Sequence, residues 1–113
     1  ATGIMVNEAV MAAEELAKDG IDARVIDIHT IKPIDEEIII KAARETGKIV
    51  TAEEHSVIGG LGSAVAEVIV KNTPVKMAFV GQKDTYGESG KPEELKTKYG
   101  MTAADIVLAA KSL

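Results

Sequence analysis

Two carboxylates, one histidine and three glycines lie within ten consecutive positions of this sequence, from Glu53 to Gly62. Carboxylate and imidazole groups are the usual agents of proton transfer, and glycines ahead of a helix let backbone amides hold a phosphate. The residue types and their spacing therefore raise two hypotheses, a general base beside an orienting carboxylate and an anion-binding turn. Both hypotheses depend on how the predicted strand and helix around these residues position their side chains and amides.

The glycines lie between a predicted strand and a predicted helix, which is where ligands bind in open α/β sheets. Gly60, Gly62 and Ser63, with the first amides of the helix, form a candidate anion-binding turn. The pattern is G-x-G-x-x-V, so the third glycine of a dinucleotide fingerprint is absent, and no Walker lysine follows. The alternative is a structural turn in which the glycines permit positive φ and close packing.

Glu53, His55 and Tyr86 are the other candidates, for an interface or a local polar site. Successive side chains of a strand point to opposite faces, so Glu53 and His55 share a face only if the strand reaches that far. The alternative is a histidine at the strand end, hydrogen-bonded locally or at a subunit contact. His29 should lie at the same sheet edge, but no spacing matches a known metal motif. We therefore assign no metal ligand and no catalytic residue.

Hydrophobic periodicity predicts helices that alternate with strands along the chain. The predicted strands are 22–31, 48–54 and 75–81, and the predicted helices begin near Val6, Asp35, Leu61, Pro92 and Thr102. Asp35 and Thr102 are predicted helix caps, and Gly47 is a predicted helix stop. This order predicts an α/β fold, with a mostly parallel sheet covered by helices on both faces, in one domain over residues 1–113.

The first predicted helix is amphipathic and ends at Gly20. Its polar face includes Glu8 and Glu14. Its predicted apolar face consists of Val6, Ala9, Val10, Ala13, Leu16 and Ala17. The helix follows directly on Ala-Thr-Gly, residues 1–3, where an α/β domain normally has a strand. These residues have the pattern of a strand end, so we expect the chain to be a piece of a longer one.

The composition excludes several classes of function. The chain has no cysteine, which excludes disulfides, thiolate metal sites and a cysteine nucleophile, and suits a reducing cytoplasm. The net charge is −5, with acidic and basic residues interspersed, so there is no basic stripe for nucleic acid or an anionic membrane. Uncharged runs are far shorter than the ~20 apolar residues of a membrane span.

Three longer segments resemble a known family. They are VIDIHTIKPIDEE (25–37), IVTAEEHSVIGGLGSAVAEVI (49–69) and KDTYGESGKPEELKTKYGMTAADIVLAA (83–110). Together they resemble the C-terminal domain of transketolase-type thiamine-diphosphate enzymes, which include transketolase, 1-deoxyxylulose-5-phosphate synthase and the β subunits of 2-oxo-acid dehydrogenases. The likeness is greatest to the C-terminal half of split transketolases from archaea and bacteria, and it covers essentially the whole chain.

The resemblance implies a three-layer α/β/α sandwich around a mostly parallel sheet, with the first family strand and most of the second missing here. It implies that thiamine diphosphate and Mg²⁺ are bound between the N-terminal and middle domains of two subunits. The Gly-Asp-Gly motif that binds the magnesium ion in the family is absent from this sequence. The resemblance implies that this chain binds no cofactor and is inactive alone. It also implies that the chain's partner is the N-terminal and middle thiamine-diphosphate-binding domains, or a separate subunit that contains them, and that the enzyme is a homodimer.

Two alternatives remain open at this point. The chain resembles the C-terminal docking or regulatory domain of a dehydrogenase β subunit or of 1-deoxyxylulose-5-phosphate synthase, and dehydrogenases use this region to dock an acyltransferase core. An autonomous phosphate- or nucleotide-binding module would use Gly60, Gly62 and Ser63. The run GESGKPEEL, residues 87–95, favours a transketolase over both.

Overall fold

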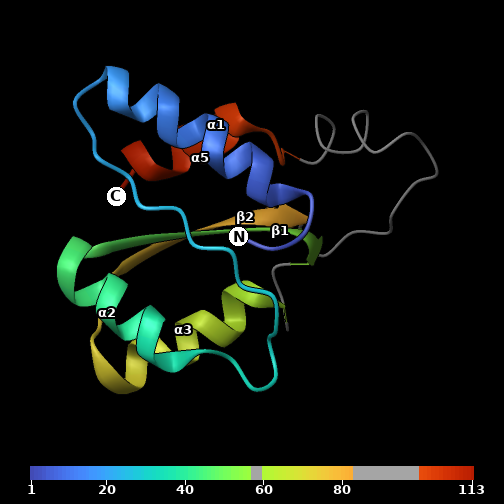
Figure 1. Ribbon diagram of the computed structural model, residues 1–113, viewed down its shortest axis with the longest axis vertical. Coiled ribbons are helices and arrows are strands. Elements are labelled where there is room, and N and C mark those ends of the chain that lie inside the picture. Colours follow the sequence, from blue (N-terminus) through green and yellow to red (C-terminus); the bar gives the residue numbers. More distant parts are fainter. Residues whose placement is uncertain (57–59, 83–99) are drawn as a thin grey trace.

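The computed structural model describes residues 1–56, 60–82 and 100–113 (Figure 1). The helices are α1 (Met5–Lys18), α2 (Glu36–Thr46), α3 (Leu61–Asn72) and α5 (Ala103–Lys111), and the strands are β1 (Lys48–Ser56) and β2 (Lys76–Gln82). The helix predicted to begin at Pro92 and the loop that contains Tyr86 lie outside the described residues. In the described part of the chain, no helix is long and apolar enough to cross a membrane.

Strands β1 and β2 form a parallel sheet between two layers of helices. Lys48 lies opposite Lys76 and Ala52 opposite Val80, and the register becomes irregular after Ala52. Helix α3 connects the two strands, as parallel pairing requires. Helices α1 and α5 lie on one face of the sheet, and α2 and α3 lie on the other (Figure 1). The structure therefore confirms the predicted three-layer α/β/α arrangement.

Each face of the sheet has its own hydrophobic core, because side chains alternate along a strand. In β1, Ile49 packs with α2 and α3, and Val50 packs with α1 and α5. The buried members of the α2–α3 core are Ile28, Ile39, Ala43, Leu61, Val65, Val68 and Ile69. The buried members of the α1–α5 core are Met5, Ala12, Ala52, Val80, Met101 and Ile106. Both layers of helices are thus held to the sheet mainly by buried apolar surface.

Local signals set the ends of α2 and α5 as the sequence predicts. The Asp35 carboxylate accepts a hydrogen bond from the Ile38 amide at 3.2 Å, and Gly47 ends α2 in the left-handed conformation with φ of 77°. Thr102 and Asp105 form a capping box at the start of α5. These caps lie within a few residues of the helix that they serve, which is why sequence alone predicts them.

The predicted strand at 22–31 is wrong, because these residues adopt no regular strand. Within residues 1–56, 60–82 and 100–113, the backbone of this segment hydrogen-bonds with Ala1. The Ala1 amino group donates to the Ile26 carbonyl at 2.9 Å, and the Ile28 amide donates to the Ala1 carbonyl at 2.9 Å. A strand needs a continuous ladder of backbone hydrogen bonds with its neighbour, and among the described residues this segment makes these two bonds in place of a ladder.

The predicted buried face of α1 is also wrong in part. Val10 is 41% exposed and Ala17 is exposed, whereas Glu8 is buried. Helix α1 is turned so that Glu8 Oε2 accepts a hydrogen bond at 3.0 Å from the amide of Ala103, the first residue of α5. A negative charge at a helix N-terminus is favourable, so this contact ties the two helices of one layer together.

Replacing Glu8 with alanine should lower the free energy of unfolding by about 1–2 kcal/mol, because the Ala103 amide loses a charged acceptor. Glu14→Ala is the matched control on the exposed side of the same helix, and its effect should stay within about 0.5 kcal/mol. Urea unfolding followed by circular dichroism measures both. Equal values for the two variants would contradict a role of Glu8 in holding α5.

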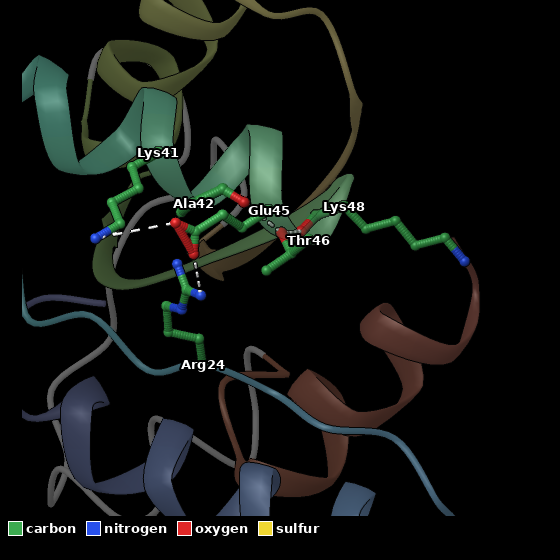
Figure 2. A network of polar contacts seen from close by, with 6 residues as sticks. All are labelled: Arg24, Lys41, Ala42, Glu45, Thr46 and Lys48. Atoms are coloured by element: carbon green, nitrogen blue, oxygen red, sulfur yellow. Dashed lines mark hydrogen bonds and ion pairs between the residues drawn. The ribbon is translucent and has the colours of Figure 1, made fainter.

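A polar network joins the 22–30 segment to α2 (Figure 2). Arg24 Nη2 lies 2.5 Å from Glu45 Oε2, and Lys41 Nζ lies 3.9 Å from Glu45 Oε1. At the end of α2, the Thr46 hydroxyl contacts the carbonyls of Ala42 at 2.6 Å and Lys48 at 3.1 Å. The Arg24–Glu45 pair is partly exposed, so its contribution to stability is modest.

The Arg24–Glu45 pair should make the free energy of unfolding depend on pH in the acidic range. The hydrogen bond from Arg24 lowers the pKa of Glu45 below its ordinary value of 4.5. The Glu45 carboxylate therefore binds a proton less readily in the folded state than in the unfolded state. The stabilisation by the Arg24–Glu45 pair is present above pH 4.5 and is lost as the pH falls through the lowered pKa of Glu45. The free energy of unfolding of Glu45→Gln should therefore fall less steeply than that of the wild type below about pH 5. Parallel profiles in urea titrations would contradict this.

Candidate functional site

The Glu53 side chain lies at the N-terminus of α3. Glu53 is in β1 on the face toward α3, and it is 2% exposed. Its Oε2 atom accepts a hydrogen bond from the backbone amide of Leu61, the first residue of α3. The carboxylate charge faces the positive end of the helix dipole, where an anion is stabilised. Glu53 therefore connects the end of β1 to the start of α3.

The candidate anion-binding turn thus contains a carboxylate of the chain itself. Gly60 is the residue before α3, with φ of −99°, and the positive-φ glycines of the described residues lie elsewhere in the chain. Gly62 and Ser63 belong to the first turn of α3. An external anion at this turn would share the helix N-terminus with Glu53. Anion binding by Gly60, Gly62 and Ser63 stays a prediction, and it has a specific internal competitor.

Gly62 lies where α3 comes closest to the sheet. A Cβ atom at this position would lie 2.6 Å from Phe79 Cδ1 and 3.1 Å from Thr51 Oγ1. Thr51 belongs to β1 and Phe79 to β2, so one glycine allows the helix to approach both strands. This is the close packing that the sequence offered as the alternative to an anion site, and no positive φ is needed for it.

The remaining candidates are only partly described. The backbone of His55 belongs to β1, but its side chain lies outside the described part of the structure, as does all of Tyr86. His29 is exposed, and its Nε2 atom lies 3.7 Å from Asp27 Oδ2. Among the described residues, no group of three or more His, Asp or Glu side chains could hold a metal ion. The structure therefore joins Glu53 to the α3 turn and describes no contact between Glu53 and the other two candidates.

Comparison with known proteins decides the family. The family model described as "Transketolase, C-terminal domain" matches residues 1–106. This chain belongs to the transketolase C-terminal domain family. The resemblance identified in the sequence is thereby confirmed over nearly the whole chain.

Relatives of this transketolase C-terminal domain are longer proteins. A 6-deoxy-6-sulfo-D-fructose transketolase subunit of Clostridium sp. (strain MSTE9) is 56% identical over 110 residues, which is 97% of this chain and 34% of that protein. A 1-deoxy-D-xylulose-5-phosphate synthase of Desulforudis audaxviator (strain MP104C) is 44% identical over 114 residues, 99% of this chain and 18% of that protein. The chain therefore spans about a third or less of the length of these relatives.

A solved structure shows the same fold. It is described as "Split gene transketolase, inactive beta4 tetramer", and it matches with a TM-score of 0.93 and 52% sequence identity. The match covers 98% of this chain and 36% of that one. This transketolase C-terminal domain thus has the fold of the corresponding part of a split transketolase, as predicted.

Two buried polar contacts of the domain could not be predicted from the sequence. Glu8 and Glu53 each accept a hydrogen bond from the first amide of a helix elsewhere in the fold. Glu8 and Ala103 are 95 positions apart, so no local pattern distinguishes Glu8 from the exposed Glu14. The sequence predicts Glu53 as a candidate because of its carboxylate, and in the structure this carboxylate contacts the candidate anion-binding turn at Leu61.

Proposed function

We propose that this chain is the non-catalytic assembly domain of a thiamine-diphosphate-dependent transketolase. The whole enzyme transfers a two-carbon ketol unit between phosphosugars, and the cofactor and Mg²⁺ are bound by other domains or by a separate subunit. The observation on which this rests is the match of the entire chain to about a third of a split transketolase chain, with a TM-score of 0.93.

The geometry of the glycine turn supports a structural role. The polar group that is best placed for chemistry, the Glu53 carboxylate, is 2% exposed and accepts a hydrogen bond from the α3 amide. Gly62 is packed against Phe79 and Thr51. Glu53 of β1 and Gly62 of α3 therefore both contribute to joining α3 to the sheet. A domain of this kind stabilises the assembly without contacting the reacting atoms.

Reconstitution tests the proposal. The tagged chain should recover a thiamine-diphosphate-binding transketolase half from a co-expression lysate, and ketol transfer should appear in the recovered complex. The chain alone should show no ketol transfer. Activity of the chain alone would overturn the proposal, as would recovery of an acyltransferase core without the transketolase half.

The second candidate is the equivalent domain of a 1-deoxyxylulose-5-phosphate synthase. The 44% identity to the synthase of Desulforudis audaxviator (strain MP104C) over 99% of the chain favours it. The two candidates share the assembly role and differ in the reaction of the parent enzyme. Assaying the reconstituted complex for both products separates them, because a synthase complex would form 1-deoxyxylulose 5-phosphate and a transketolase complex would not.

A further inference from the structure

Helix α5 is held to the domain by little buried apolar surface. Of its nine residues, Ile106 alone is buried, whereas the twelve residues of α3 include five buried ones. Leu108 lies on the outer side of α5 and is 67% exposed. Since buried apolar surface is the main force that holds a helix to a sheet, α5 is more weakly attached than α3.

Polar contacts at both ends of α5 tie it to α1, which lies beside it (Figure 1). At the start of α5, Glu8 Oε2 accepts the hydrogen bond from the Ala103 amide at 3.0 Å. At its end, Lys111 Nζ lies 2.6 Å from Oδ2 of Asp19, the residue that follows α1. Glu8 is buried, whereas the side chains of Lys111 and Asp19 are about half exposed. One end of α5 is therefore fixed in the core and the other is open to solvent.

Helix α5 covers β2 on this face of the sheet. Helix α1 packs against β1, and α5 packs against both strands. Val80 of β2 is buried in the same core as Ile106 of α5. The backbone pairing of the sheet joins β1 to β2 directly. Departure of α5 would therefore uncover Val80 and leave the pairing of the strands intact.

We propose that α5 is a strap over β2, which opens while α1, α3 and both strands stay folded. Elements with few buried apolar contacts open at a lower free energy than the whole domain. A helix of nine residues is shorter than the ~12–15 at which isolated helices become marginally stable, so α5 loses its helical structure when it opens. The apolar face of β2 is then a contact surface that exists in the open state and is covered in the closed one.

A single introduced thiol tests the proposal, because the chain has no cysteine. Val80→Cys places the thiol beneath α5. Val65→Cys is the matched control, since Val65 is equally buried in the α2–α3 core on the other face of the sheet. In native buffer, a neutral thiol reagent should modify position 80 at least about thirtyfold faster than position 65, because strap opening exposes it without global unfolding. Low concentrations of urea should barely change the rate at position 80, since local opening exposes little surface, and should raise the rate at position 65.

The exposed end contact gives a second measurement. Adding Lys111→Gln to the Val80→Cys chain removes the ion pair with Asp19, and modification should become about threefold faster, as expected for a partly exposed pair. Leu108→Ala, on the outer side of the same helix, is the control and should leave the rate unchanged. An unchanged rate in Lys111→Gln would overturn the role of the ion pair in closing the strap.

Hydrogen exchange of the wild-type chain decides the matter if a cysteine variant does not fold. After correction for intrinsic rates, the Val107 and Ala110 amides of α5 should exchange together, at least about thirtyfold faster than the Val68 and Ile69 amides of α3. Equal exchange in the two helices would overturn the proposal. So would equal modification rates at positions 80 and 65 with the same dependence on urea, because both thiols would then be exposed by global unfolding.

Discussion

Replacing Gly62 with valine should lower the free energy of unfolding by about 3 kcal/mol, which is roughly 10 °C in Tm for a domain of this size. The Cβ atom of any side chain at this position would lie 2.6 Å from Phe79 Cδ1 and 3.1 Å from Thr51 Oγ1. Phe79 is 46% exposed, so its ring can turn toward solvent, but Thr51 is 4% exposed and lies buried between α3 and the sheet. Helix α3 must therefore shift away from the sheet.

Ser63→Val is the matched control for this prediction. Ser63 is the next residue of α3 and is exposed, so the added methyl groups meet no strand, and stability should fall by about 1 kcal/mol or less through loss of the serine's own contact. Combining Gly62→Val with Phe79→Ala should recover part of the loss, because one of the two clashing groups is removed. Thermal unfolding of the variants measures the effect. A Gly62→Val variant as stable as Ser63→Val would show that α3 does not approach the strands this closely.

Replacing Glu53 with alanine should lower the free energy of unfolding by about 2–3 kcal/mol. The substitution removes a buried charged acceptor from the Leu61 amide and leaves the positive end of the α3 dipole without its carboxylate. Glu53→Gln keeps the size of the side chain and an acceptor oxygen but removes the charge, so it should cost about half as much. Urea unfolding at neutral pH measures both variants.

The control for this prediction is the neighbouring carboxylate, Glu54. Adding inorganic phosphate to the same variants also tests whether the turn can hold an anion. Glu54→Gln changes a carboxylate on the opposite face of β1, away from α3, and should have a smaller effect. If the turn at Gly60, Gly62 and Ser63 can hold an anion, phosphate should raise the Tm of Glu53→Ala more than that of the wild type. Equal stability of Glu53→Ala and Glu54→Gln would contradict the role of Glu53 at the helix N-terminus.

Features with local causes could be predicted from the sequence. The cap at Asp35, the stop at Gly47 and the capping box at Thr102 each depend on contacts within about one helical turn. Hydrophobic periodicity also predicts both observed strands within two residues of their bounds and the start of α3 at Leu61. The three-layer arrangement follows from that order of elements, since a parallel sheet needs helices on both faces.

Features that depend on distant partners could not be predicted. Residues 22–31 have the composition of a strand, but whether they form one depends on the backbone that they pair with, and among the described residues their backbone pairs with Ala1. Glu8 has the polarity of an exposed helix residue and is buried because the N-terminus of α5 packs against it. At the site, the sequence leaves open whether the glycines hold an anion or form a closely packed turn, and the contact of Gly62 with Phe79 requires the fold.

The central claim is that this domain assembles with a thiamine-diphosphate enzyme and does not bind the cofactor itself. Calorimetric titration of thiamine diphosphate with Mg²⁺ into the chain tests it most directly, with circular dichroism to show that the chain is folded. We predict no heat beyond that of dilution, because the Gly-Asp-Gly motif that binds the magnesium ion in the family is absent from this sequence. Saturable binding at micromolar concentration would contradict the account.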